Sequence, residues 1–172
     1  MAAEALELVA SRADPPGVAD LWLLRAGSVA DLAARVSSAN WREHVDGRGG
    51  FGLLLAWAGE TPDFAEMAAL ARTLIEQGMF YFGAWGSGSA RIEYAVDVTD
   101  LTVQLDASPE PDAPIVMTTA FGVVPLEEAV FELWELAPRD EGKAPGPARV
   151  VVVLGADPDA ALASAVRGRA GS

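Results

Sequence analysis

The chain of 172 residues contains no cysteine, a single histidine and few basic side chains. The absence of cysteine excludes disulfide frameworks, thiolate metal sites, cysteine nucleophiles and iron–sulfur ligation. A single histidine excludes multi-histidine metal sites, and it makes His44 the only conventional base near neutral pH. Apolar residues nevertheless make up 51% of the chain, which is too much for a disordered protein. At this length we expect one compact domain with a substantial core.

Long hydrophobic runs are missing as well. The longest apolar runs, residues 51–58 and 150–154, fall far short of the roughly 20 residues that span a bilayer. The first residues, MAAEALELVASRA, carry acids where a secretory signal would carry bases, and they contain no long apolar stretch. The sequence therefore predicts no membrane association and a cytoplasmic location.

Basic residues are also scarce. Twelve lysines and arginines stand against 25 aspartates and glutamates, which gives a net charge of −13, and residues 60–141 alone hold 16 acidic and 3 basic residues. Such a surface repels phosphate backbones, so we expect no nucleic-acid partner. It would attract a basic protein through long-range electrostatics. Solubility is the plainer explanation of the same charge.

From residue 50 onward, short apolar runs alternate with stretches that have helical spacing. The run at 51–58 has the length and continuous apolarity of a strand that is covered on both faces, and apolar or β-branched runs at 79–85, 115–119 and 149–155 are predicted to be further parallel strands. Between the first two runs, Thr61-Pro62-Asp63 offers a helix start and Gly78 a helix stop. Such alternation predicts an α/β fold, a three-layer sandwich around a mostly parallel, doubly wound sheet that resembles the general Rossmann-like or flavodoxin-like architecture.

Two stretches are ambiguous. Residues 91–105 have both helical and alternating apolar spacing, and we favour a helix because a parallel crossover needs a dozen or more residues. Residues 1–48 contain two candidate strands and a candidate helix that begins after Ser28, and they either extend the sheet or form a cap over it. We expect this extension to pack on an α/β core of residues 49–167, followed by a frayed tail, 168–172.

The glycine-rich turn after the second predicted strand is the first candidate binding site. Backbone N–H groups at a helix start can hold a phosphate or carboxylate where glycines allow close approach. The turn lacks the spacing of dinucleotide-binding, nucleotide-triphosphate and hydrolase motifs, and we favour the explanation that it is a tight turn with a serine as helix cap. Its residues are Gly86, Ser87, Gly88 and Ser89.

Polar residues at the other predicted strand ends extend this site. Ligands of open parallel sheets bind beyond the carboxyl ends of the strands, where Glu60, Thr118, Thr119 and Asp157 are expected. His44 could act as a base only if the fold brought it to Ser87 or Ser89. No metal-binding pattern and no cofactor motif is visible, so the sequence predicts neither.

A second candidate surface is the predicted helix 125–137. Three and four residues separate Glu128, Glu132 and Glu135, which would group them on its outward side, while Leu126, Val130 and Leu133 face the core. Two functions follow from these features. We expect foremost a non-catalytic interaction module, such as an inhibitor, immunity-type protein or adaptor, that binds a basic protein through these carboxylates. The alternative is a small-molecule or nucleotide-binding domain, with or without enzyme activity, that uses the strand ends.

Overall fold

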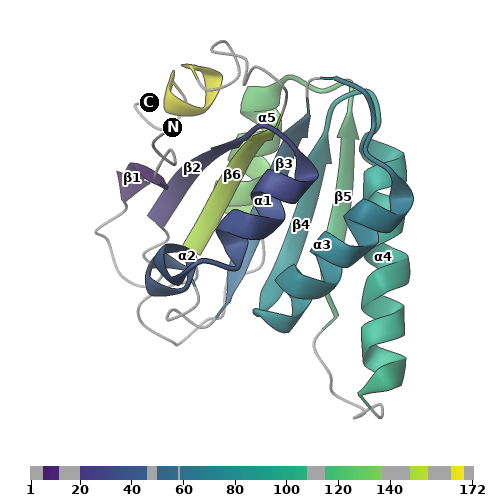
Figure 1. Cartoon of the computed structure of the whole chain (residues 1–172). Helices are drawn as coiled ribbons and strands as arrows, with labels where there is room; N and C mark the ends of the chain where they lie inside the picture. The colour runs from purple at the N-terminus through teal and green to yellow at the C-terminus, as the bar shows by residue number, and fades with distance from the viewer. Residues whose placement is uncertain are drawn as a thin grey trace.

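The computed structural model describes most of the chain as one α/β fold (Figure 1). The described residues are 6–11, 20–45, 50–57, 59–107, 115–136, 148–154 and 164–168. Within them the elements follow in the order β1 (Glu7–Ser11), β2 (Asp20–Ala26), α1 (Val29–Val36), α2 (Ala39–His44), β3 (Phe51–Trp57), α3 (Phe64–Glu76), β4 (Met79–Trp85), α4 (Ser89–Asp106), β5 (Met117–Gly122), α5 (Leu126–Phe131), the π-helix η2 (Glu132–Leu136) and β6 (Ala148–Leu154). Residues 164–168 are helical as well.

The strands of the described residues form one sheet in the order β1-β2-β6-β3-β4-β5. Every pair is parallel except β1 with β2, which is antiparallel. The last strand, β6, is inserted between β2 and β3 and pairs with both along its length. β6 therefore connects the N-terminal strands β1 and β2 to β3, β4 and β5 in one sheet.

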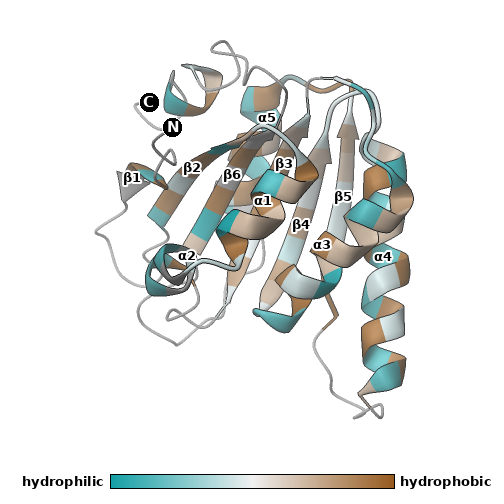
Figure 2. Ribbon diagram, in the orientation of Figure 1, coloured by the Kyte–Doolittle hydropathy of each residue, from teal (hydrophilic) through white to brown (hydrophobic). Residues whose placement is uncertain are grey.

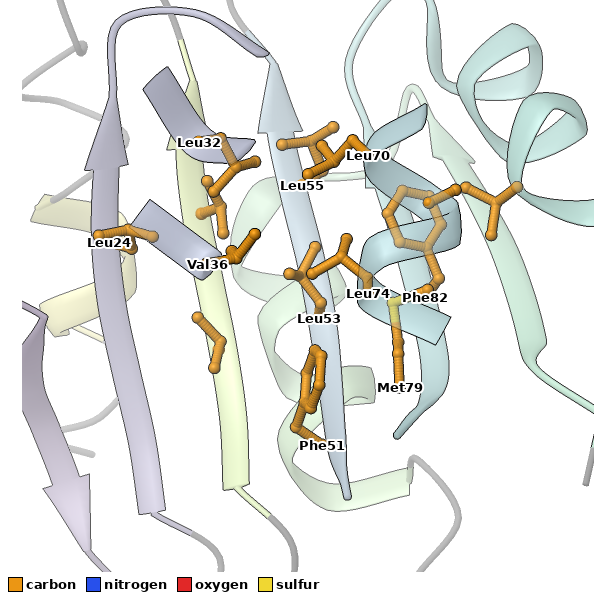
Figure 3. Packing of buried hydrophobic residues seen from close by; sticks show 14 of the residues in the cluster. Leu24, Leu32, Val36, Phe51, Leu53, Leu55, Leu70, Leu74, Met79 and Phe82 are labelled. Carbon is orange, nitrogen blue, oxygen red and sulfur yellow. The ribbon is translucent and has the colours of Figure 1, made fainter. Parts of the chain in front are cut away.

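Helices cover both faces of this sheet and produce the predicted three layers. α1, α2, α3 and α4 contribute to one buried cluster, in which Leu32, Leu70 and Leu74 meet Leu53 and Leu55 of β3 (Figure 3). α5 and η2 cover the opposite face, where Leu126, Val130 and Leu133 pack with Leu54 and Tyr81. Burial of apolar side chains on both faces explains why the central strands lack polar alternation.

The four predicted strands and the helix predicted over 91–105 are confirmed. The stretch before residue 49 extends the sheet through β1 and β2, and Ser28 caps α1 by accepting a hydrogen bond from Asp31 N at 3.1 Å. β5 ends at Gly122, three residues later than the sequence predicted. On its outward side α4 also carries apolar residues, which appear as brown bands in Figure 2.

The helix predicted over 125–137 is regular only as far as Phe131. From Glu132 the backbone continues as the π-helix η2, whose wider turn changes which side chains share a face. Glu132 is half-buried in this turn rather than outward, so the predicted row of exposed carboxylates is interrupted there. The prediction assumed α-helical spacing through the whole segment.

Candidate functional site

The edge of the sheet where the parallel strands end brings together the loops that the sequence singled out. We call residues 59–63, 86–88 and 123–125, which follow β3, β4 and β5, the carboxyl-end edge. The chain leaves β4 toward the face covered by α4, and it leaves β5 toward the face covered by α5. Adjacent strands whose connections diverge in this way form a topological switch point, the usual ligand position in open α/β sheets.

The glycine-rich turn lies at this switch point. Gly86 has a φ of 114°, and a Cβ built on it would lie 2.6 Å from the carbonyl oxygen of Trp57, so this position requires glycine. Ser89 is buried, and its hydroxyl oxygen accepts a hydrogen bond from Gly122 N at 3.1 Å. That bond ties the start of α4 to the end of β5. The hydroxyl therefore holds the two loops together instead of capping α4, whose N-cap residue Gly88 makes no side-chain cap bond.

Two contacts hold the neighbouring loops against this turn. A Cβ on Gly88 would overlap the side chain of Thr61, so Thr61 packs directly on the glycine backbone. On the other side, Trp85 Nε1 donates to the carbonyl of Val124 at 2.7 Å. Three loops that are distant in sequence are thus locked against one another where a ligand of this fold would bind.

The remaining strand-end residues are dispersed. Glu60 is exposed in the loop after β3, and Ser87 is exposed in the glycine-rich turn. Thr118 and Thr119 lie near the start of β5, on opposite faces of the sheet, rather than at its carboxyl end. Asp157 lies outside the described residues. The structure therefore brings Gly86, Ser87, Gly88 and Ser89 near Glu60 and places the two threonines elsewhere.

Thr118 belongs to a contact that fastens α4 to the edge strand. Its hydroxyl donates to Asp97 Oδ1 at 2.7 Å, and one turn later Asp100 Oδ2 accepts from Val116 N at 3.3 Å. Gln104 Nε2 also donates to Asp100 Oδ2 at 2.7 Å, and burial raises the pKa of this carboxyl above its usual value. These two acids support the helix–strand contact.

His44 lies at the opposite end of the sheet from the glycine-rich turn. It ends α2, which leads into the amino end of β3, whereas Ser87 and Ser89 follow the carboxyl end of β4 (Figure 1). Its ring packs edge-on against Trp22, with 5.0 Å between the ring centroids, and Nδ1 lies 2.8 Å from the carbonyl of Asn40. A base–nucleophile pair between His44 and these serines is excluded by the topology.

A polar cluster on the face covered by η2 was not among the residues predicted from the sequence. The buried hydroxyl of Tyr81 is hydrogen-bonded to Thr119 Oγ1, 3.1 Å away, and donates to Glu132 Oε1 at 3.3 Å. Burial raises the pKa of Tyr81 to about 12, and the adjacent Glu132 carboxylate adds to the rise. Tyr81 is therefore protonated at neutral pH and acts as a hydrogen-bond donor. No short sequence motif marks this cluster, since its members come from β4, β5 and η2.

Exposed carboxylates collect at and just beyond the carboxyl-end edge. The first turns of α3 and α5 begin there, because each helix follows a parallel strand. Acids in such turns are favoured by the helix dipole, and Asp63 also caps α3 by accepting from Ala65 N at 3.0 Å. Residues 59–66, 86–92 and 122–128 contain one base, Arg91. The exposed acids of these stretches are Glu60, Asp63, Glu66, Glu127 and Glu128.

Comparison with known proteins places most of this architecture in one family. Residues 27–165 match the family described as Domain of unknown function (DUF7684). The chain belongs to the DUF7684 family. The matched range of this DUF7684 member contains the glycine-rich turn and α5, and it begins directly after β2. Neither the curated proteins nor the solved structures include a match to the chain.

Two features are absent from the described part of this DUF7684 member. There, no group of three or more histidine, cysteine, aspartate or glutamate side chains is arranged to hold a metal ion. No helix among the same residues has the length and apolarity to cross a membrane.

Proposed function

We propose that this DUF7684 member is a non-catalytic interaction domain that binds a basic protein through its carboxyl-end edge. The observation that carries the proposal is the set of exposed carboxylates that α3, α5 and the preceding loops present there, with Arg91 as the one base in those stretches. A like-signed patch of this kind attracts an oppositely charged partner and accelerates its association. The contacts of Thr61 with Gly88 and of Trp85 with Val124 at the switch point also support binding by surface contact.

Within this proposal, the docking residues differ from those that the sequence suggested. Glu128 is exposed beside Glu127 in the first turn of α5, so both carboxylates are accessible to a partner. Glu132 already accepts a hydrogen bond from Tyr81, and Glu135 is half-buried. We therefore assign recognition to Glu127 and Glu128 together with Glu60, Asp63 and Glu66.

The test uses the partner that the tagged protein captures from a lysate of its own source, identified and then purified. The double variant Glu127→Gln, Glu128→Gln should lower the association rate about tenfold at low salt, since it removes two steering charges. Glu43→Gln, Glu76→Gln is the matched control, because these exposed acids lie at the other end of the sheet. Added salt should slow the wild type toward the double variant. Equal rates for both double variants would contradict the proposal.

Small-molecule binding at the same edge is the second candidate function. One observation favours it: the first turn of α4 lacks a side-chain cap, and Ser87 beside it is exposed. A helix start of this kind can accept an anion. Titration with inorganic phosphate, followed by amide chemical shifts, tests it; shifts confined to residues 86–90 would support this candidate. Because Thr61 packs on Gly88 at this helix start, small-molecule binding is the weaker of the two candidate functions.

A further inference from the structure

The outward side of α4 carries an apolar row that no described element covers. Tyr94, Leu101 and Leu105 are 62%, 61% and 74% exposed, and Val98 between them is half-buried. Their spacing of four, three and four residues places them on one side of the helix, opposite the side on which Ile92 and Val96 enter the core. We call Tyr94, Val98, Leu101 and Leu105 the outer seam of α4.

The outer seam is unusual for this protein because it contains no charged residue, whereas the chain as a whole carries a net charge of −13. Spacing of four and three residues is that of helices that pack lengthwise against another helix. The ring of Phe64 on α3, itself exposed, extends the seam at its Tyr94 end, with 6.2 Å between the two ring centroids. A partner helix would cover an apolar surface built from both helices.

The spacing of the seam is also the same when it is read backwards. If two copies of α4 pack antiparallel about a two-fold axis between residues 99 and 100, Tyr94 of one copy lies opposite Leu105 of the second copy. Val98 then lies opposite Leu101. A two-fold interface requires this kind of self-complementary surface, and antiparallel helices also bring opposite dipole ends together.

In the same antiparallel arrangement, a basic residue beside the seam of one copy comes to the end of the seam where the other copy has an acidic residue. Asp106 lies on the side of α4 that faces α3, where it pairs with Arg72 at 3.1 Å. Arg91, fifteen residues earlier, lies on the same flank at the other end of the seam, about 60° closer to the seam around the helix. Reversal of the second copy brings Arg91 of one molecule to the Asp106 end of the other. On the opposite side of the seam, Asp97 is already held by Thr118.

We propose that the outer seam of α4 is a homodimer interface, on which a second copy of this chain packs its own α4 antiparallel. The seam is a single helix face with one added ring, so the interface is at the small end of the usual range and dissociation should be micromolar. The Tyr94 end of the seam adjoins Phe64, and so lies near Asp63 and Glu66 of α3. Glu127 and Glu128 belong to α5 on the opposite face of the sheet, and variants of these two residues therefore test the basic partner separately from this proposal. The dimer and the complex with a basic partner should also respond to salt in opposite directions. Salt should strengthen the dimer, because it screens the repulsion between two acidic molecules.

The first test is sedimentation equilibrium of the full chain over a range of micromolar concentrations. The wild type should dimerise, and Leu101→Glu should raise the dissociation constant at least about tenfold, because it places like charges next to the two-fold axis. Val123→Glu is the control, since Val123 is fully exposed in the loop after β5 and outside the seam. Circular dichroism establishes that each variant is folded, which the exposure of both side chains leads us to expect.

A second test fixes the register through disulfide formation, which is practical because the chain has no cysteine. In the antiparallel arrangement two copies of residue 94 are eleven residues apart along the helix, or about 16 Å, too far for a disulfide. Tyr94→Cys and Leu105→Cys should therefore each fail to cross-link alone and should form a mixed disulfide when combined. Cross-linking of either variant with itself would overturn the antiparallel register.

The dimer proposal is overturned if the wild type remains a monomer at every concentration and salt condition. Retention of the dimer by Leu101→Glu would overturn the assignment of the interface to this seam. Loss of affinity for a basic partner in Glu127→Gln, Glu128→Gln with an intact dimer would support both proposals. The failure of one proposal is thus distinguishable from the failure of the other.

Discussion

At the scale of single residues, the carboxyl-end edge depends on backbone positions that other side chains cannot occupy. Gly86 and Gly59 both have positive φ, 114° and 147°. They differ in their surroundings, since a Cβ on Gly86 would meet the Trp57 carbonyl at 2.6 Å and a Cβ on Gly59 would meet nothing within 4 Å. A comparison of alanine variants at these two positions therefore separates the energetic cost of backbone strain from the cost of steric contact.

Gly86→Ala should lower the free energy of unfolding by more than about 2 kcal/mol, because it combines a strained φ with a clash against backbone. Gly59→Ala should cost about 1 kcal/mol, which is the conformational strain alone. Urea denaturation of both variants measures the difference. Equal losses of unfolding free energy in the two variants would show that the contact with the Trp57 carbonyl does not destabilise Gly86→Ala.

Tyr81 permits a prediction about alkaline pH. Its raised pKa, about 12, means that the folded protein holds the phenolic proton more tightly than the unfolded chain does. The free energy of unfolding should therefore fall as the pH rises from about 10 toward 12. Tyr81→Phe should remove this part of the pH dependence, and at neutral pH it should cost about 1 kcal/mol for the lost hydrogen bonds. Urea titrations at several pH values test both effects, and a fall of the same size in the variant would contradict the assignment.

At the scale of elements, helix ends follow local rules and helix interiors do not always do so. Ser28 and Asp63 accept hydrogen bonds from the first turns of α1 and α3, as residues of these types do at helix starts. The segment after Phe131 instead departs from α-helical geometry, which brings Glu132 to Tyr81 across the sheet face. No local capping rule predicts that departure, because its partner is 51 residues away.

The cap of α1 gives the element-scale prediction. Ser28→Ala should lower the free energy of unfolding by about 1 kcal/mol, since it leaves the N–H of Asp31 without its side-chain acceptor. Ser37→Ala, at the other end of the same helix, removes only an exposed hydroxyl that donates to Ala33 O, and it should change stability by less than about 0.5 kcal/mol. Thermal and urea unfolding measure both. A larger loss for Ser37→Ala would contradict the role of the cap.

At the scale of the whole molecule, the net charge of −13 opposes the compact state through mutual repulsion. Sodium chloride should therefore raise the urea midpoint at neutral pH, most steeply up to ~0.2 M, where the screening length falls to molecular contact distances. The same titration near the isoelectric point, pI ≈ 4.3, is the control and should show a smaller rise. A midpoint that falls with salt would mean that ion pairs such as Arg35–Asp31 outweigh the repulsion.

The sequence by itself determined the class of fold and most of its elements. Continuous apolar runs at β3 and β4 predict strands covered on both faces, because this signal acts between neighbouring residues. Thr61-Pro62-Asp63 predicts a helix with Pro62 as its first residue, and α3 begins two residues later, with Asp63 as the N-cap. It also identified the glycine-rich turn, although not the contacts that Thr61 and Ser89 make there.

Only the tertiary structure decided where these elements meet. The insertion of β6 between β2 and β3, the bond between Ser89 and Gly122, and the distance of His44 from both serines all depend on pairings between remote parts of the chain. The outer seam of α4 is recognised only after the other side of that helix is known to face the core, since both sides are apolar. Periodicity reports what a residue's neighbours are, whereas a binding surface is defined by what the folded chain leaves uncovered.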